Sequence, residues 1–234
     1  MANQIAGNAK NILVGASPLF ISNLDVTTSG YVENFAPGEA GSTAPAFSAP
    51  TASADGKSYT DTLNEVTATT TPAFYYRNVG YTNNGLQVTY NPSYGSVTVD
   101  QLLDSAKLFK ETMEVMIATE MAEGTLENVL AVFGQASSTL TESGKKLGLA
   151  GGALGEAPTE RQLIAVGQAP TAAGESATER VYYARRVLSV QQSQFTLARS
   201  APTTFPVTFR LLPTAMTGYE GQEYGKIIDR VLAV

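Results

Sequence analysis

The sequence predicts a mainly β protein with one flanking α-helix, folded as a two-sheet antiparallel sandwich or barrel. About eight or nine short segments rich in β-branched and aromatic residues follow one another, separated by Gly, Pro, Asn and Ser. Residues 111–121 alternate strictly between two faces, and only residues 125–135 have the spacing of a good helix. Many short strands with regular turn signals are typical of sandwiches and barrels. We expect the 234 residues to form one domain.

The N-terminal half begins with an expected strand pair, residues 12–14 and 19–26. Residues 74–81 and 86–90 then flank Asn83-Asn84-Gly85. Asn and Gly tolerate positive φ, so this tripeptide predicts a hairpin turn between two strands. Residues 96–99 are a further short strand candidate.

Residues 111–121 are the clearest expected strand. Five side chains share one face, and the opposite face carries carboxylates, which predicts a half-buried strand. The five residues are Met113, Val115, Ile117, Thr119 and Met121.

The expected helix begins after Thr125, which can cap it, and Gly134 can end it. Its apolar residues Leu126, Val129, Leu130 and Phe133 recur at helical spacing. Beyond the helix, the sequence predicts strands at residues 162–166, 181–191, 195–199 and 205–212, and a closing strand that begins at Ile227.

Two segments lack a strand or helix pattern. Residues 34–64 are rich in Pro, Gly, Ala, Ser and Thr, and such a composition buries too little apolar surface to offset the entropy of ordering. We expect this long loop to be mobile in a free subunit. Residues 136–160 form a second, Gly/Ala-rich loop.

Composition argues against most enzymes. The chain has no Cys, no His and no Trp, which removes thiol nucleophiles, His-based triads and the commonest metal ligands. Glu120, Glu123 and Glu127 could gather at a strand-to-helix junction, but carboxylates near a helix N-terminus are the simpler interpretation. We therefore expect no catalytic residues, no cofactor and no metal.

Charge points to contacts between proteins. Only 15% of the residues are charged, and the net charge of −6 does not suit a protein that grips nucleic acid. A surface poor in charge is typical of a subunit that its neighbours cover. Residues 12–21 are about half the length of a membrane span and lack the features of a secretory leader, so no membrane association is expected.

Five sequence features follow one another along the chain. They are ILVGASPLFIS near the start, FYYRNVGYTNNGLQVTYNP followed by VTVDQ, MAEGTLENVLAVFG at the helix, VYYARRVLSV, and TTFPVTFRLLP. In this order they resemble the major tail tube proteins of long, non-contractile (siphovirus-type) phage tails. The similarity covers most of the chain except residues 34–70 and 136–160.

The resemblance implies two antiparallel sheets with a flanking helix, in the phage tail tube type of fold. Hexameric rings of this subunit would stack into a hollow tube in the virion tail, assembled in the host cytoplasm. Double-stranded DNA would pass through it during genome ejection. The family also implies tape measure, tail terminator and distal tail proteins as partners.

The resemblance assigns two sets of site residues. By position, the loop that reaches the adjacent ring would be residues 34–64, including Asn34, Pro37, Pro45, Phe47, Pro50, Tyr59 and Asn64. An acidic lumen would not trap a polyanion, and we expect Glu114 and Glu120 to face it while Met113, Val115 and Ile117 pack under the helix.

Other function classes stay open. The chain could be a different virion structural protein, such as a tail terminator or a capsid decoration protein. Its 11 Tyr would suit a β-sandwich binding module for glycans. A carboxylate-based glycosidase is a further alternative, although no paired acid motif supports it.

Overall fold

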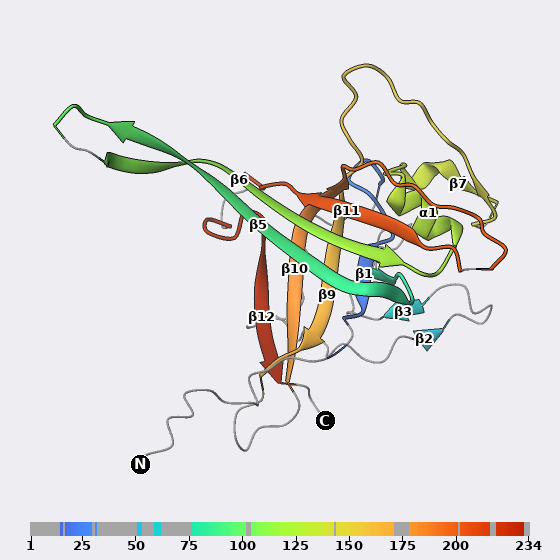
Figure 1. Cartoon of the computed structure of the whole chain (residues 1–234). Helices are drawn as coiled ribbons and strands as arrows, with labels where there is room; N and C mark the ends of the chain where they lie inside the picture. The colour runs from blue at the N-terminus through green and yellow to red at the C-terminus, as the bar shows by residue number, and fades with distance from the viewer. Residues whose placement is uncertain are drawn as a thin grey trace, which may run out of the picture.

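In the computed structural model the chain is mainly antiparallel β-structure with a single α-helix among the described residues, as the sequence predicts (Figure 1). The described residues are 15, 17–29, 31, 51–52, 59–61, 76–101, 104–142, 144–170, 178–200, 202–215 and 219–231.

One hydrogen-bonded sheet contains nearly all of the strands, in the order β2-β3-β4-β1-β9-β10-β11-β6-β5, with β12 also paired to β10. The strands are β1 (Leu19–Ser22), β2 (Thr51–Ala52), β3 (Tyr59–Asp61), β4 (Tyr76–Asn78), β5 (Thr82–Thr98), β6 (Ser105–Met121), β9 (Arg161–Gln168), β10 (Thr178–Ser189), β11 (Phe205–Leu211) and β12 (Gly225–Val231). A separate two-stranded hairpin pairs β7 (Leu140–Thr141) with β8 (Lys146–Leu147).

At strand β10 the sheet changes direction, so that it forms two layers. Its first part, up to Ala184, pairs with β12, and its end, from Val187, pairs with β11 on the same side. The register shifts between Ala184 and Val187, a bulge that bends the strand. The layer β11-β6-β5 then crosses the layer that contains β9, β10 and β12 (Figure 1). Within the described chain the sheet does not close into a barrel, since its outermost strands are β2 and β5.

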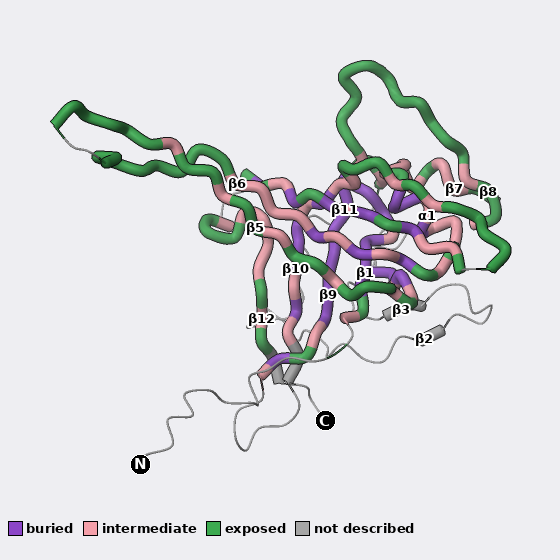
Figure 2. Tube along the Cα trace, in the orientation of Figure 1, coloured by how far each residue is buried: buried purple, intermediate pink, exposed green. Residues whose placement is uncertain are grey.

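The main core lies between these layers. It takes buried side chains from β1, β9 and β10 on one side and from β6 and β11 on the other, and Ala131 and Val132 of the helix complete it. A second cluster, with Phe20, Ile164 and Tyr183, covers the opposite face of β1, β9 and β10. Strand β9 is buried on both faces from Arg161 to Val166 (Figure 2).

Helix α1 (Leu126–Val132) begins and ends as the sequence predicts. The Thr125 side chain accepts a hydrogen bond from the Asn128 N–H, and Gly134 has φ 63° just beyond the end. Asn128 is fully buried: it accepts from Arg77 Nη1 at 2.6 Å and donates to the carbonyl oxygens of Val79 and Glu123. It therefore ties the helix to the chain that leaves β4.

The predicted hairpin at Asn83-Asn84-Gly85 is wrong. Asn84 and Gly85 do have positive φ, 61° and 69°, but they lie inside β5. The β5–β6 register shifts between Asn83 and Gln87, so the tripeptide forms a β-bulge. The segment before it belongs to β4, which pairs with β1 and β3.

Two further expectations need correction. Residues 195–199 form no strand, and Phe195 instead packs its ring 4.7 Å from that of Phe205. The loop at residues 136–160 contains a 3-10 turn, η2 (Ser137–Thr139), and the β7–β8 hairpin before an exposed stretch.

Of the expected loop 34–64, the structure describes only β2 and β3, which pair with each other. The backbone of Tyr59 pairs there with Ala52. Asn34, Pro37, Pro45, Phe47, Pro50 and Asn64 lie outside the described residues, as does the expected strand 12–14.

Candidate assembly surface

The two long strands β5 and β6 form a ribbon that extends well beyond the body (Figure 1). They pair with each other from Thr82 and Met121 to Thr98 and Ser105. Strand β11 pairs with β6 only between Met121 and Met116. The rest of the ribbon is therefore two strands wide, and most of its residues are exposed (Figure 2).

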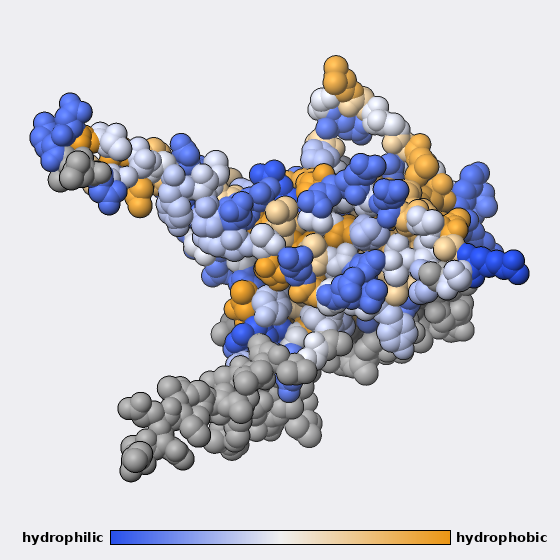
Figure 3. Space-filling model, in the orientation of Figure 1, coloured by the Kyte–Doolittle hydropathy of each residue, from blue (hydrophilic) through white to orange (hydrophobic). Residues whose placement is uncertain are grey.

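Large apolar side chains lie on this exposed ribbon. Tyr90 and Tyr94 are each 59% exposed and Leu108 is 64% exposed, and Val97 and Phe109 are also exposed. Hydrophobic patches are visible among polar side chains along the β5–β6 ribbon (Figure 3). Because an isolated two-stranded hairpin is at best marginally stable in water, this ribbon gains from a partner that covers it.

The ribbon also contains an edge strand of the sheet, β5. In the part of the chain that the structure describes, β5 pairs with β6 alone and β12 pairs with β10 alone. Each strand thus presents a row of N–H and C=O groups to another chain. The 17 residues of β5 make an unusually long edge.

An apolar groove joins the ribbon to the body. It has a volume of about 240 Å³ and lies between β5–β6 and the strands β10 and β12. Its lining includes Val88, Tyr90, Met113, Tyr224 and Ile227. Val88 and Ile227 remain exposed, so the chain by itself leaves this apolar surface in water.

The alternation of β6 is as predicted. Ile117, Thr119 and Met121 are buried, and Ile117 and Met121 belong to the main core with the helix. Val115 is half-buried and packs against that core, whereas Met113 lines the apolar groove.

Glu114 and Glu120 lie on the opposite face of β6, both half-buried. Glu114 Oε1 is 3.6 Å from Arg210 Nη1. Glu120 accepts hydrogen bonds from the Asn84 side chain at 2.6 Å and from the Thr204 hydroxyl at 2.5 Å. The bulge thus holds Glu120, a contact that the sequence did not indicate.

Glu120 also borders a polar groove of about 340 Å³ over β5, β6 and β11. Its polar lining includes Gln87, Gln191, Gln192 and Thr208. No aromatic ring lines this groove among the described residues, so it lacks the stacking surface on which a sugar usually packs.

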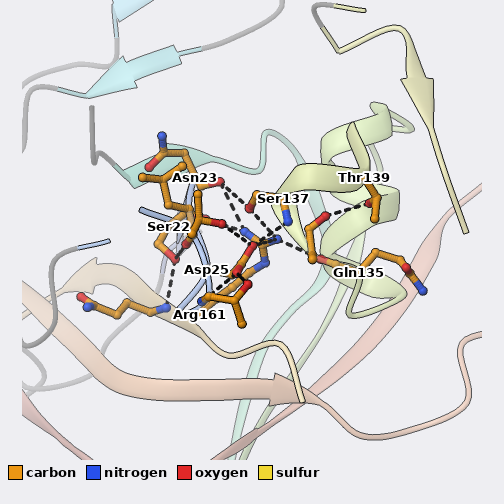
Figure 4. Close-up of polar contacts among 12 residues, drawn as sticks. Ser22, Asn23, Asp25, Gln135, Ser137, Thr139 and Arg161 are labelled. Atoms are coloured by element: carbon orange, nitrogen blue, oxygen red, sulfur yellow. Dashed lines mark hydrogen bonds and ion pairs between the residues drawn. The ribbon is translucent and has the colours of Figure 1, made fainter. Parts of the chain in front are cut away.

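A buried polar network ties β1 to the end of the helix (Figure 4). The Asp25 carboxylate accepts hydrogen bonds from Thr27 and from the Ser137 N–H at 2.6 Å, and it lies 3.8 Å from Arg161 Nη2. Arg161 Nη1 donates to the carbonyl of Ser22, and Nη2 donates to that of Gln135.

Electrostatics explain why this network persists. Burial alone would raise the pKa of Asp25, but the hydrogen bonds from Thr27 and Ser137 and the charge of Arg161 outweigh it and lower the pKa to about 2. Burial lowers the pKa of Arg161 to about 10, in part offset by Asp25. Both groups are charged at neutral pH. Their partners are backbone groups, the hydroxyls of Thr27, Thr28 and Ser137, and each other, so the network is structural.

The next question is whether side chains gather that could bind a metal ion. No group of three metal-ligating side chains forms within the described ranges, and Glu123 instead accepts from the Tyr81 N–H at 3.0 Å. In the same ranges, no helix has the length and apolarity needed to cross a bilayer. Comparison with protein-family models and with curated proteins found no match.

Proposed function

We propose that this protein is a self-assembling structural subunit. The observation that carries the proposal is the projecting β5–β6 ribbon, which combines a long unpaired edge with exposed apolar side chains. A second copy that pairs with this edge would remove it from solvent, and head-to-tail repetition of one contact gives a ring or a filament. The apolar groove beside the ribbon and the charge-poor surface support the same interpretation.

Among such subunits, we propose a major tail tube protein of a siphovirus-type phage, with hexameric rings stacked into the conduit for genomic DNA. The ordered sequence features that resemble this family support the assignment, and the mainly β, one-helix fold agrees with it. Glu114 and Glu120 share the outer face of β6 and are the candidates for a lumen lining that repels DNA.

Electron microscopy of the purified protein tests this proposal. Open-ended tubes are the expected product. Isolated rings or trimers would favour a tail terminator or decoration protein, and glycan binding without polymerisation would favour a binding module. Glycoside hydrolysis that a single Glu substitution abolishes would support an enzyme and overturn the proposal.

A pair of charge substitutions tests the ribbon itself. Leu108→Lys combined with Phe109→Lys adds two charges to exposed positions, so we expect an unchanged unfolding midpoint and no tubes. Leu197→Lys is the matched control, because Leu197 is 81% exposed and belongs to the segment between β10 and β11, outside the two strands of the ribbon. Normal tubes from the double variant would remove the ribbon from the assembly surface.

A further inference from the structure

Two consecutive arginines, Arg185 and Arg186, lie at the bulge where β10 changes partner from β12 to β11. Their surroundings differ sharply. Arg186 forms a two-pronged ion pair with Glu160, through Nε at 2.6 Å and Nη2 at 2.8 Å, and its Nη1 donates to the Pro213 carbonyl. Arg186 is therefore neutralised within the subunit.

Arg185 has no such partner. It is 1% exposed, and its Nε donates to the Gln222 carbonyl at 3.1 Å. Within the described chain, Nη1 and Nη2 are both buried without any hydrogen-bond acceptor. Four N–H donors of a permanently charged group are thus removed from water and left unsatisfied.

Aromatic rings compensate only part of this cost. The guanidinium carbon lies 3.9 Å from the centre of the Tyr219 ring and 5.3 Å from that of Tyr183. Ring faces attract the positive charge, but they are weak substitutes for oxygen acceptors. A buried guanidinium in a native protein is normally met by a carboxylate or phosphate.

Nearby acids are already engaged. Glu160 is held by Arg186, and the Glu223 carboxylate accepts from the Gly221 N–H at 2.8 Å. No acid in the described ranges forms an ion pair with Arg185. The missing counter-charge must therefore come from outside these residues.

We propose that Arg185 is a receptor for an oxyanion, bound by the fork of Nη1 and Nη2. A carboxylate or a phosphate group has the matching geometry, because two parallel oxygens can accept from both nitrogens. The inference is independent of the tail tube assignment, since it rests on one side chain and its unsatisfied donors.

One turn covers the Arg185 side chain. Tyr219 and Gln222, which both contact Arg185, belong to a turn closed by the Gln222 N–H and the Tyr219 carbonyl at 2.9 Å. Glu220 and Gly221 at its tip are exposed. Displacement of this turn would open the guanidinium to solvent or to another protein.

Two sources of the oxyanion are distinguished by experiment. The first measurement is thermal unfolding of the unassembled protein in phosphate, in acetate, and in sodium chloride at equal ionic strength. If the anion is free, saturating phosphate or acetate raises the wild-type midpoint by roughly 5–10 °C over chloride. Arg185→Met loses this response, and Arg185→Lys, which keeps the charge without the fork, retains only part of it.

The second measurement is self-association by sedimentation. If an acidic side chain of a second copy supplies the oxyanion, Arg185→Met weakens association by about ten- to hundredfold, while the unfolding midpoint does not respond to either anion. Arg199→Met is the matched control in both measurements. It removes the same positive charge as Arg185→Met, but from an exposed position. The proposal is overturned if neither anion stabilises the wild type and Arg185→Met associates as the wild type does. Tube formation without either effect would overturn this inference alone.

Discussion

Asp25 and Asn128 are two completely buried polar side chains, Asn128 within helix α1 and Asp25 bonded to the segment that follows the helix. Each one satisfies backbone groups from segments distant in sequence: Asp25 binds Ser137, and Asn128 binds Val79. Removal of such a group leaves its partners buried and unpaired, which costs more than the net gain of the original hydrogen bonds. At the scale of single residues, stability therefore depends on these few polar contacts as well as on the core.

Asp25→Asn tests the buried ion pair. We expect a loss of about 3 kcal/mol in the free energy of unfolding at pH 7, because Arg161 would keep its charge without a counter-ion. Urea titration measures this loss. The control is Asp229→Asn, whose partner Arg180 is near the surface, and it should cost less than about 1 kcal/mol.

The same residue predicts a pH dependence. The folded pKa of Asp25 is about 2, below the ordinary 3.8, so its contribution to stability is complete above pH 4 and is lost as the pH falls through 2. We expect the wild type to lose about 2 kcal/mol more than Asp25→Asn between pH 5 and pH 2. Parallel stability curves for the two proteins would contradict the assignment.

Asn128→Leu replaces a satisfied polar side chain with an apolar one of similar size. Arg77 Nη1 and the carbonyl oxygens of Val79 and Glu123 would each lose a partner. We expect a loss of about 3 kcal/mol or more in the free energy of unfolding, measured in urea. Exposed Asn83, changed to Leu, is the control and should change stability by less than about 0.5 kcal/mol.

At the scale of elements, the bulge in β5 decides how the longest ribbon begins. Gly85 has φ 69°, and a Cβ added there would meet no atom within 4 Å. Gly85→Ala therefore changes backbone strain alone, and we expect it to lower the unfolding free energy by about 1–2 kcal/mol.

Gly95→Ala is the matched change on the same strand. Its φ is not positive. The nearest atoms to an added Cβ belong to the tip of the exposed Phe109 ring, at 2.5 Å, and this ring can turn away. We expect an effect below about 0.5 kcal/mol. Equal losses for the two alanine variants in chemical denaturation would show that positive φ is not what Gly85 supplies.

At the scale of the whole molecule, the proposed assembly would depend on surfaces that one copy of the chain leaves uncovered. Deletion of residues 34–64 removes β2 and β3 from one edge of the sheet and leaves β4 as the edge strand. The described residues of the two core clusters come from the β1 and β4 regions, β6, β9, β10, β11 and the helix. We therefore expect a folded subunit with native circular dichroism that forms no long tubes under the electron microscope. Tubes of normal length from the deletion variant would refute the role of this segment between rings.

Much of the fold was predictable because it depends on local pattern. The alternation of β6, the Thr125 cap and the Gly134 stop follow from side-chain period and backbone preference, and all three are confirmed. The tripeptide Asn83-Asn84-Gly85 shows the limit. It determines positive φ, but a turn and a bulge both use that conformation, and strand partners decide between them.

The candidate site divides in the same way. Alternation alone places Glu114 and Glu120 on one face of β6, whereas the partners of Glu120 come from β5 and from the segment before β11. The contrast between Arg185 and Arg186 has no local signal, because it depends on where Glu160 and the turn at Tyr219 lie in space.

By itself, the sequence determined a charge-poor, mainly β chain with one capped helix and one strongly alternating strand, since these properties depend on composition and on neighbours a few residues apart. Only the tertiary structure decided which strand carries a free edge, which polar groups are buried together, and which arginine lacks a counter-charge. These outcomes depend on contacts between residues far apart in the chain, such as Asp25 with Ser137, and no local pattern specifies them.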